Sequence, residues 1–359
     1  MGVFDAIGSD THEEVLYGYD PVSGLRTIIA IHSTALGPAL GGTRFFPYET
    51  EEEALRDALR LAKGMSYKSA AAGLDLGGGK AVIIGDPDVM KTERLLRAYA
   101  RVVDSLGGRY VTAEDVGATT ADMITISTAT RWVTGLPDTY GGSGDPSPAT
   151  ARGVIGAMRC VAERLWGTED LADRTVAVQG LGKVGSRLVE RLTKAGAKTV
   201  ICDVNEAALQ RTSSEFGSVI VATDEIFDVD CDMFAPCAMG GAINEQTAAR
   251  LRCRAVVGSA NNQLETEMQA DQLAARGILY APDFIVNAGG IINIADELRG
   301  SYDWRRAAQA VDQIRDNLRK VLDKAEERGI TPNVAAIEVA RERIAGIGSI
   351  NLKRRGHKS

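Results

Sequence analysis

The sequence contains few histidines, with only three among its 359 residues. His12 lies in the polar N-terminal segment, His357 lies in a basic tail, and His32 lies in an apolar run that predicts a strand. None of these positions suits a proton shuttle. General acid–base chemistry would therefore fall to lysine or to carboxylate side chains.

Cysteine is also scarce, and its pattern excludes two classes of site. The five cysteines are scattered, odd in number and form no C-x-x-C pair. This pattern argues against a disulfide framework, and we predict no metal site. Because three of the five lie in or beside apolar runs, we expect buried thiols in a reducing cytoplasm.

Long apolar runs and an excess of basic charge are both missing. No run is long enough to cross a bilayer, and the N-terminus lacks the basic start and apolar core of a signal peptide. The 41 basic and 48 acidic residues give a net charge of −7. A negative net charge does not favour binding to nucleic acid. We expect a cytoplasmic protein with no membrane or nucleic-acid partner.

The most informative stretch is TVAVQGLGKVGSRLVERLTKAGAKTVICD, residues 175–203. A β-branched run at 175–178 predicts a buried strand. Gly180, Gly182 and Gly185 follow at G-x-G-x-x-G spacing, and a helical pattern follows them. A second apolar run then ends in Asp203.

Each part of this stretch has a role in binding a dinucleotide. Gly180 permits a tight turn, Gly182 lets the backbone approach a pyrophosphate, and Gly185 lets the helix lie close to the strand. The Asp203 carboxylate would accept both ribose hydroxyls and repel a 2′-phosphate, which favours NAD over NADP. The glycine motif alone is weak evidence, but here strand, helix, second strand and acid all have the expected spacing. The candidate cofactor residues in this stretch are Gly180, Leu181, Gly182, Lys183, Val184, Gly185 and Asp203.

Length and composition predict two α/β domains with a cleft between them. The segment GGSGDPSP, residues 141–148, is the candidate boundary, because it favours neither helix nor strand. Residues 1–145 would form a first domain that holds the substrate. Residues 146–330, where strands and helices alternate, would form a Rossmann-type doubly wound NAD-binding domain. We expect helices at about 331–350 to pack back on the first domain, and a disordered basic tail at 351–359.

The first half contains a predicted hairpin at 14–32 and a predicted amphipathic helix at 51–63. Residues 36–44 are too rich in glycine and proline to predict regular structure. Lys68 lies in a segment of small residues, Lys80 follows three glycines and precedes a strand, and Asp115 follows another strand.

Most lysines are solvated surface charges, but Lys80 does not fit that description. Burial and a neighbouring cation would lower its pKa from about 10.4 toward a usable base. If Lys68 is that neighbour, one ammonium would bind a substrate carboxylate while the other exchanges protons. Asp115 would then take a proton from an amine.

Seven motifs together resemble the Glu/Leu/Phe/Val amino acid dehydrogenase family, most closely its leucine and valine dehydrogenases. The resemblance extends from about residue 16 to residue 345. The motifs are LGPALGGTR (36–44), GMSYKSAAAGLDLGGGKAVIIGDP (64–87), TAEDVG (112–117), GLGKVG (180–185), FAPCAMGG (234–241), SANNQL (259–264) and APDFIVNAGGIIN (281–293).

The resemblance implies NAD-dependent oxidative deamination of an L-amino acid to a 2-oxo acid and ammonia, and the reverse reductive amination. It implies that Lys68 binds the substrate carboxylate with Gly42 and Asn262, that Lys80 activates the attacking water, and that Asp115 carries the amine proton. Further cofactor contacts are implied for Thr150, Ala238, Asn261, Asn262 and Asn287.

The resemblance also implies a pocket for a branched aliphatic side chain, so leucine, valine and isoleucine are the expected substrates. Glutamate dehydrogenases carry a lysine at the position of Leu40 and a serine near Ile294. Apolar residues at both positions would leave a distal carboxylate unsolvated. The pocket residues implied are Leu40, Met65, Ala113, Ile291 and Ile294.

Three alternatives remain open at this point. Phenylalanine dehydrogenase belongs to the same family, a hydroxy-acid dehydrogenase shares the nucleotide domain, and a non-catalytic NAD-binding regulator shares the fold. The family is oligomeric through its first domain, so we expect a homo-oligomer, from a dimer to an octamer.

Overall fold

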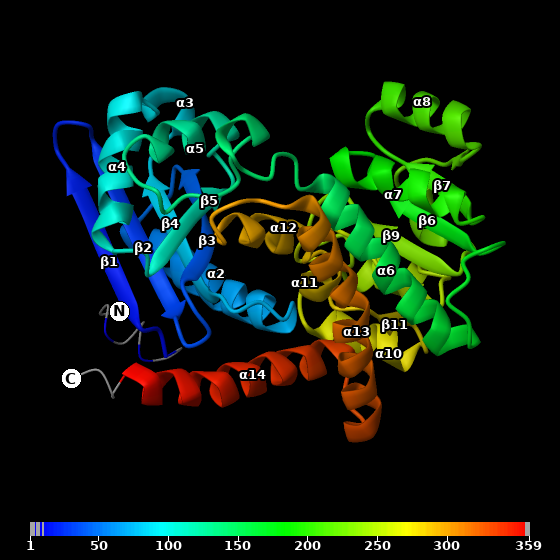
Figure 1. Ribbon diagram of the computed structural model, residues 1–359. Helices are drawn as coiled ribbons and strands as arrows, with labels where there is room; N and C mark the ends of the chain where they lie inside the picture. Colours follow the sequence, from blue (N-terminus) through cyan, green and yellow to red (C-terminus); the bar gives the residue numbers. More distant parts are fainter. Residues whose placement is uncertain (1–3, 5–7, 9–10, 356–359) are drawn as a thin grey trace. The chain divides into compact units, whose positions relative to one another are not determined.

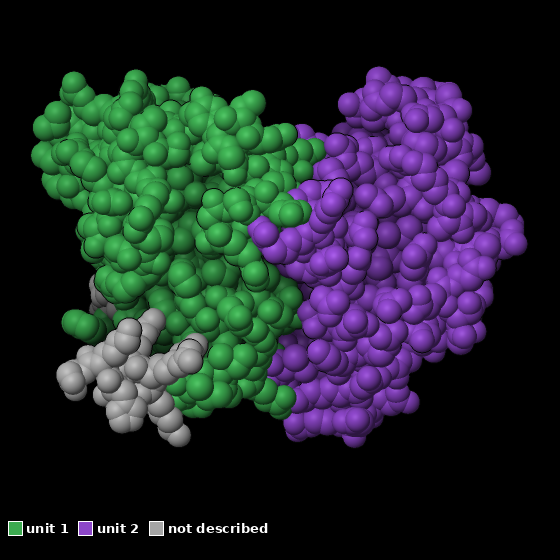
Figure 2. All heavy atoms as spheres, in the orientation of Figure 1, with its two compact units in different colours: residues 1–145, 294–303, 340–359 green, residues 146–293, 304–339 purple. Residues whose placement is uncertain are grey.

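The computed structural model of the chain describes residues 4, 8 and 11–355, without the side chains of 351–355. The chain divides into two compact units, drawn in green and purple in Figure 2. Unit 1 comprises Met1–Asp145, Ile294–Asp303 and Ala340–Ser359, and unit 2 comprises Pro146–Asn293 and Trp304–Val339. The chain thus leaves unit 1 inside the glycine-rich segment 141–148. The sequence assigned 294–303 to the second domain, but this segment belongs to unit 1.

Unit 1 is built on a five-stranded mixed sheet (Figure 1), in which β1 and β2 form the predicted hairpin. β4 pairs antiparallel with β2, whereas β3 pairs parallel with both β4 and β5. The strand order is β1-β2-β4-β3-β5. The strands are β1 (Glu14–Asp20), β2 (Leu25–Ser33), β3 (Ala39–Phe46), β4 (Gly77–Ile84) and β5 (Tyr110–Glu114).

The sequence interpretation was wrong at residues 36–44, where it predicted no regular structure. Residues from Ala39 onward form β3, which pairs with strands on both sides. The two glycines in this strand allow the neighbouring backbones to approach. A Cβ on Gly41 would lie 1.7 Å from the Gly79 carbonyl oxygen. Pairing with β4 and β5 therefore overrides the low intrinsic strand propensity of this stretch.

Helices cover both faces of this sheet. The α2 helix (Glu51–Ala71) begins at the N-cap Thr50 and packs its alanine and leucine face on β2 and β4. It runs eight residues beyond the predicted end at residue 63. The α4 helix (Glu93–Ser105) and the α5 helix (Thr120–Ser127) cover the opposite face. The short α3 helix (Pro87–Met90) connects β4 to α4.

Unit 2 has the predicted doubly wound architecture, with six strands paired in parallel in the order β11-β10-β9-β6-β7-β8. The fold class predicted from the sequence is therefore confirmed. The strands are β6 (Thr175–Gln179), β7 (Lys198–Cys202), β8 (Val219–Ile220), β9 (Met233–Pro236), β10 (Ala255–Val256) and β11 (Leu279–Tyr280). The helices are α6 (Ser147–Trp166), α7 (Lys183–Lys194), α8 (Glu206–Phe216), α9 (Glu245–Arg250), α10 (Met268–Ala275), α11 (Asp283–Val286) and α13 (Trp304–Arg328).

Two late segments complete unit 1. The α12 helix (Gly289–Glu297) ends at Glu297, whose carboxylate accepts from the Thr134 hydroxyl at 2.8 Å and from the Ser143 amide at 2.9 Å. The α14 helix (Pro332–Arg355) returns to unit 1, where Arg343 contacts Asp75 at 2.7 Å. A disordered tail was expected from residue 351. The helix instead extends to Arg355, and residues 356–359 lie outside the described part of the chain.

Among the described residues, no helix has the length and apolar character needed to cross a bilayer.

Candidate active site

One face of the unit 1 sheet gathers most of the predicted substrate residues. Val82 and Ile84 of β4 pack against α2. Because side chains alternate along a strand, Lys80 lies on this same face. Register then places Leu40 and Gly42 of β3 beside it, with Ala113 of β5 next to Gly42. Residues far apart in sequence therefore share one surface beneath α2.

Lys80 and Asp115 are in direct contact across this surface. The Lys80 ammonium donates to Asp115 Oδ2, and the two side chains are 6% and 19% exposed. Asp115 directly follows β5, and its other oxygen, Oδ1, lies 3.8 Å from Arg44 Nη2. A buried amine and a carboxylate thus sit within proton-transfer distance of each other.

The pKa of Lys80 is lowered to about 7, and burial is the largest cause. The Arg44 guanidinium and, to a smaller extent, the Lys68 ammonium lower it further, whereas the Asp57 carboxylate opposes the shift. The Asp115 carboxylate also favours the charged form. We expect the burial and the neighbouring cations to dominate, which gives an amine that exchanges protons near neutral pH.

Lys68 and Met65 lie in the last turns of α2, the helix that packs on this face. The helix lies close to β4 because Gly78 has no side chain: a Cβ there would lie 2.1 Å from the Ser66 amide nitrogen. Ser66 Oγ in turn lies 2.8 Å from His32 Nδ1. Lys68 and Met65 are both half-buried. The close contact at Gly78 therefore sets the position of the helix that carries them.

The predicted side-chain pocket residues are apolar and mostly buried. Leu40 is completely buried, Ala113 is 6% exposed, and Ile294 is half-buried on α12. Ile291 is buried on the same helix but belongs to unit 2, as does Asn262. The predicted substrate set is thus divided between the two units.

Sequence reasoning missed Arg44, the charged residue that lowers the pKa of Lys80 most. Arg44 Nη1 donates to Asp57 Oδ2 at 2.8 Å, and the Tyr48 hydroxyl donates to the same oxygen at 2.7 Å. Arg44 lies two residues after Gly42 on the same strand. Strand alternation would have placed it on the Lys80 face, but the sequence interpretation assigned no strand there.

In unit 2, the predicted glycine loop connects β6 to α7. Gly180 has a φ of +96°, and a Cβ there would lie 2.8 Å from the Ala238 Cβ, so the loop after β6 meets the loop after β9. A Cβ on Gly185 would lie 1.9 Å from the Gly180 carbonyl oxygen, so the absence of a side chain there lets α7 pack against the end of the strand. Gly180 and Gly185 therefore lie where a side chain would clash with neighbouring atoms.

Asp203 lies at the end of β7 beside this loop. Its Oδ2 accepts from the Leu181 amide at 2.5 Å, and its Oδ1 accepts from the Asn205 amide at 2.8 Å. A carboxylate has about four lone-pair positions, so two remain for other donors.

The N-terminus of α7 carries no side-chain cap. Gly182 is the N-cap residue, and nothing lies within 4 Å of the position that its Cβ would occupy. Lys183 and Val184 form the first turn of the helix. Their amide groups have no partner within the helix. An uncapped helix start beside open space is suited to an anion.

The remaining predicted cofactor residues lie in unit 2, chiefly at the C-terminal ends of β9 and β10. Asn287 donates to Asn261 Oδ1 at 2.9 Å, and its own buried Oδ1 has no hydrogen-bond partner among the described residues. Asn262 has a left-handed φ of +50°. Thr150 is buried on the first turns of α6, where its hydroxyl donates to the Pro146 carbonyl at 3.2 Å.

Family models cover almost the whole chain. The Glu/Leu/Phe/Val dehydrogenase dimerisation domain matches residues 13–132. The Glutamate/Leucine/Phenylalanine/Valine dehydrogenase model matches residues 141–213 and 202–349. The two matches meet near the first boundary between the units, at Asp145, but the second match also includes residues 294–303 and 340–349, which belong to unit 1.

Individual proteins give the same result. Leucine dehydrogenase from Geobacillus stearothermophilus is 50% identical over 96% of this chain and 94% of its own length. Valine dehydrogenase from Streptomyces coelicolor is 51% identical over 93% of this chain and 92% of its own length. The crystal structure of L-tryptophan dehydrogenase from Nostoc punctiforme is 41% identical with a TM-score of 0.89, covering 96% of this chain and 99% of that one. The chain therefore belongs to the Glu/Leu/Phe/Val dehydrogenase family and is an amino acid dehydrogenase.

Proposed function

We propose that this protein catalyses the NAD-dependent oxidative deamination of branched-chain L-amino acids to 2-oxo acids and ammonia, and the reverse reductive amination. Leucine, valine and isoleucine are its substrates. The observation that carries the proposal is the buried Lys80, with a pKa of about 7, which contacts Asp115 on the sheet face that also carries Leu40, and which lies near enough to Lys68 for that charge to lower its pKa. The similarity to leucine and valine dehydrogenases supports it.

The chemistry assigned to unit 1 begins with the amino acid. Lys68 pairs with the substrate carboxylate, and Asp115 accepts a proton from the substrate ammonium. Loss of hydride from the α-carbon of the resulting neutral amine then gives a protonated imine. Neutral Lys80 takes a proton from a water molecule as the water oxygen attacks the imine carbon. Asp115 returns its proton to the nitrogen of the carbinolamine, the hydroxyl group loses its proton to solvent, and ammonia leaves to give the 2-oxo acid.

The residues of unit 2 fit a dinucleotide. The uncapped start of α7, open at Gly182, would hold the pyrophosphate, and Asp203 would accept the ribose hydroxyls. The unpartnered Asn287 oxygen would accept from a carboxamide. NAD, when bound, supplies the hydride acceptor for deamination and the hydride donor for amination. The Asp203 charge disfavours a 2′-phosphate, so we propose NAD rather than NADP.

Apolar residues argue for an aliphatic substrate side chain. Leu40 and Ala113 are buried, and Ile294 is apolar. A glutamate side chain would have to lose the hydration of its distal carboxylate without gaining a partner there. The structural similarity to an L-tryptophan dehydrogenase makes aromatic amino acids, including phenylalanine, the second candidate class.

We also propose that the protein forms a homo-oligomer through unit 1. The first family model is described as a dimerisation domain. β1 is an edge strand of the sheet. Two of its residues, Tyr17 and Tyr19, are 48% and 73% exposed to solvent. An edge strand with exposed aromatic side chains is suited to a protein contact.

A panel of 2-oxo acids tests the substrate assignment. With NADH and ammonium held constant, we expect kcat/KM to be highest for 4-methyl-2-oxopentanoate and 3-methyl-2-oxobutanoate. Phenylpyruvate and indole-3-pyruvate test for activity toward aromatic amino acids, and 2-oxoglutarate tests for activity toward glutamate. A maximum at either aromatic acid or at 2-oxoglutarate would overturn the assignment.

A further inference from the structure

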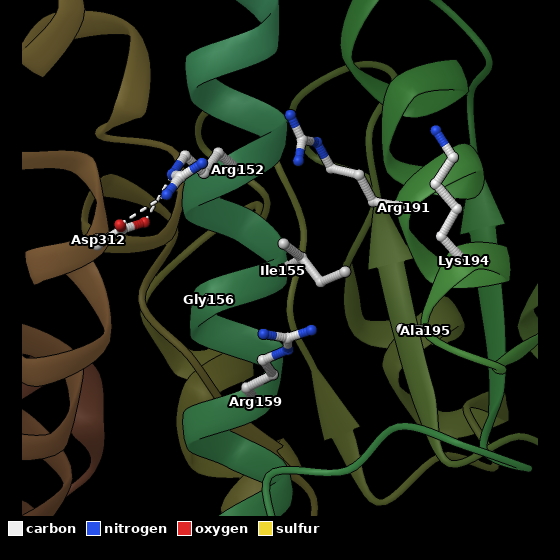
Figure 3. A pocket seen from close by; sticks show the side chains of 8 residues that line it. All are labelled: Arg152, Ile155, Gly156, Arg159, Arg191, Lys194, Ala195 and Asp312. Atoms are coloured by element: carbon white, nitrogen blue, oxygen red, sulfur yellow. Dashed lines mark hydrogen bonds and ion pairs between the residues drawn. The ribbon is translucent and has the colours of Figure 1, made fainter. Parts of the chain in front are cut away.

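A basic pocket of about 320 Å³ lies in unit 2, away from the glycine loop (Figure 3). Helix α6 forms one wall and helix α7 forms the other. Asp312 of α13 lies at the margin. The lining residues are Arg152, Ile155, Gly156, Arg159, Arg191, Lys194, Ala195 and Asp312.

The sequence places these residues on matching helix faces. On α6, Arg152 and Arg159 are seven residues apart, with Ile155 and Gly156 between them at the i+3 and i+4 positions. Residues at this spacing lie on one face of a helix. In Figure 3, the Arg191 side chain reaches from α7 toward α6. Two basic faces therefore meet across a shared space.

The positive charge of this pocket is only partly neutralised. Arg152 donates to both Asp312 oxygens, at 2.6 and 2.7 Å. Lys194 donates to Glu190 at 2.5 Å. Neither Arg159 nor Arg191 has an ion pair with any described residue. Two guanidiniums thus remain available on opposite walls, in a chain whose net charge is −7.

The surroundings of Arg191 show how closely the cations are placed. Burial lowers the pKa of Arg191, and the neighbouring Arg152 and Arg187 lower it further, whereas Glu190 opposes the shift. Basic residues in the last turn of α7 also stabilise the helix C-terminus, which explains why Arg191 and Lys194 are there. That effect does not explain why Arg159 of α6 faces the same cavity.

The pocket is separate from the proposed NAD site. α7 begins at Lys183, beside the glycine loop, and Arg191 lies eight residues later. At 1.5 Å per residue, the two are about 12 Å apart along the helix axis. An anion held by Arg191 is therefore not the pyrophosphate at the α7 N-terminus.

We propose that this pocket binds a compact phosphate-bearing anion, either free pyrophosphate or the diphosphate of a nucleotide. Guanidinium groups from two walls match the spread oxygens of a diphosphate, because each presents a planar fork of donors. Gly156 leaves room for the ligand, since nothing lies within 4 Å of the position of its Cβ. The lining has no aromatic ring on which a base would stack, so we expect free pyrophosphate to be the stronger ligand.

Calorimetric titration of the full-length protein with sodium pyrophosphate tests the proposal. The titration is run at constant ionic strength, without divalent cations, and with saturating NADH to occupy the dinucleotide site. Binding of NADH is established first by its fluorescence, so a failure of the cofactor assignment is seen separately. We expect pyrophosphate to bind in the presence of NADH.

Arg159→Gln and Arg191→Gln should each weaken pyrophosphate binding about tenfold, since each removes a charge-assisted contact. The matched control is Arg211→Gln on α8, an exposed arginine outside the pocket. It changes the net charge equally and should leave binding unchanged. Equal weakening in all three variants would overturn the proposal, because it would indicate only a response to net charge.

Gly156→Glu provides a second, independent test. The new carboxylate would occupy the pocket, so pyrophosphate binding should be lost while the melting temperature is kept or raised. A titration with ADP then distinguishes the two ligands. If ADP binds at least as tightly as pyrophosphate, and with the same dependence on Arg159 and Arg191, the ligand is a nucleotide diphosphate. If ADP binds more weakly than pyrophosphate, the ligand is the free anion. Pyrophosphate binding that persists in Gly156→Glu, or that disappears when NADH is present, would overturn the proposal.

Discussion

The Lys80 ammonium contacts the Asp115 carboxylate on the α2 face of the unit 1 sheet, and both groups are largely removed from solvent. β4 carries the amine and the end of β5 carries the acid, and β3 lies between the two strands. The pairing of three strands therefore brings together two groups that are 35 residues apart in the chain. The predictions on the chemistry rest on this arrangement.

Lys80→Ala should lower kcat by roughly 10²–10⁴-fold, because it removes the proposed general base. NADH should still bind, since the proposed nucleotide residues belong to unit 2. The matched control is Lys198→Ala, another lysine on a strand, which is 69% exposed. Steady-state kinetics with L-leucine and a fluorescence titration of NADH measure both effects. Near wild-type kcat in Lys80→Ala would remove Lys80 from the mechanism.

The pH dependence of deamination should report the ionisation of Lys80. Only the neutral amine accepts a proton, and its pKa is lowered to about 7, so the base form dominates above that pH. We expect kcat/KM for L-leucine to rise with pH up to about 7 and to level off above it. Below pH 7 it should decrease as expected for the binding of a single proton. A profile with no inflection between pH 6 and 8 would contradict the assignment.

Arg44→Gln should move this acid limb to higher pH. The Arg44 guanidinium disfavours the charged form of Lys80, so its removal raises the Lys80 pKa. The matched control is Arg56→Gln on α2, an arginine that is 74% exposed and pairs only with Glu52 in the described structure. An acid limb that stays in place, or moves to lower pH, would show that Arg44 does not tune Lys80.

Local sequence signals predicted one part of this site and missed another. The run of glycines before Lys80 and the strand before Asp115 are visible in short windows, so both residues were found. β3 was missed because its stability comes from pairing with β4 and β5, which no window around residues 36–44 contains. Arg44 was missed with it, because its role depends on the face that the strand presents.

The unit 2 predictions were more complete because their signals lie close together in the chain. The glycine spacing and the following helix fall within one βαβ segment, and the structure has β6, α7 and β7 there. The basic pocket was not predicted. Its two faces belong to α6 and α7, and only tertiary packing places Arg159 near Arg191.

Asp203→Ala should weaken NAD binding and reduce the preference for NAD over NADP. The substitution removes a ribose acceptor together with a charge that repels a 2′-phosphate. The ratio of kcat/KM for NAD to that for NADP measures the effect. Asp271→Ala, at an exposed position on α10, is the matched control. If the ratio is unchanged, Asp203 is not the ribose ligand.

Leu40→Ala should shift the preference from branched aliphatic 2-oxo acids toward phenylpyruvate. Leu40 is completely buried, so its truncation opens space that an aromatic ring would fill. For an aliphatic substrate, the same space would cost about 1–3 kcal/mol of transition-state binding.

The control for this variant is its melting temperature, because truncating a buried leucine also costs about 2–5 kcal/mol of stability. In a folded Leu40→Ala protein, the kcat/KM ratio of 4-methyl-2-oxopentanoate to phenylpyruvate should fall. An unchanged ratio would mean that Leu40 does not line the substrate pocket.

The central claim is that the protein is an NAD-dependent dehydrogenase of branched-chain amino acids. Its most direct test is the oxidation of NADH with 4-methyl-2-oxopentanoate, measured at 340 nm with and without ammonium. We predict that NADH is consumed only when both the oxo acid and ammonium are present, and that leucine forms in equal amount. Oxidation without ammonium would indicate a hydroxy-acid dehydrogenase, and no oxidation under either condition would mean that the protein does not act on this branched-chain oxo acid; either result would contradict the claim.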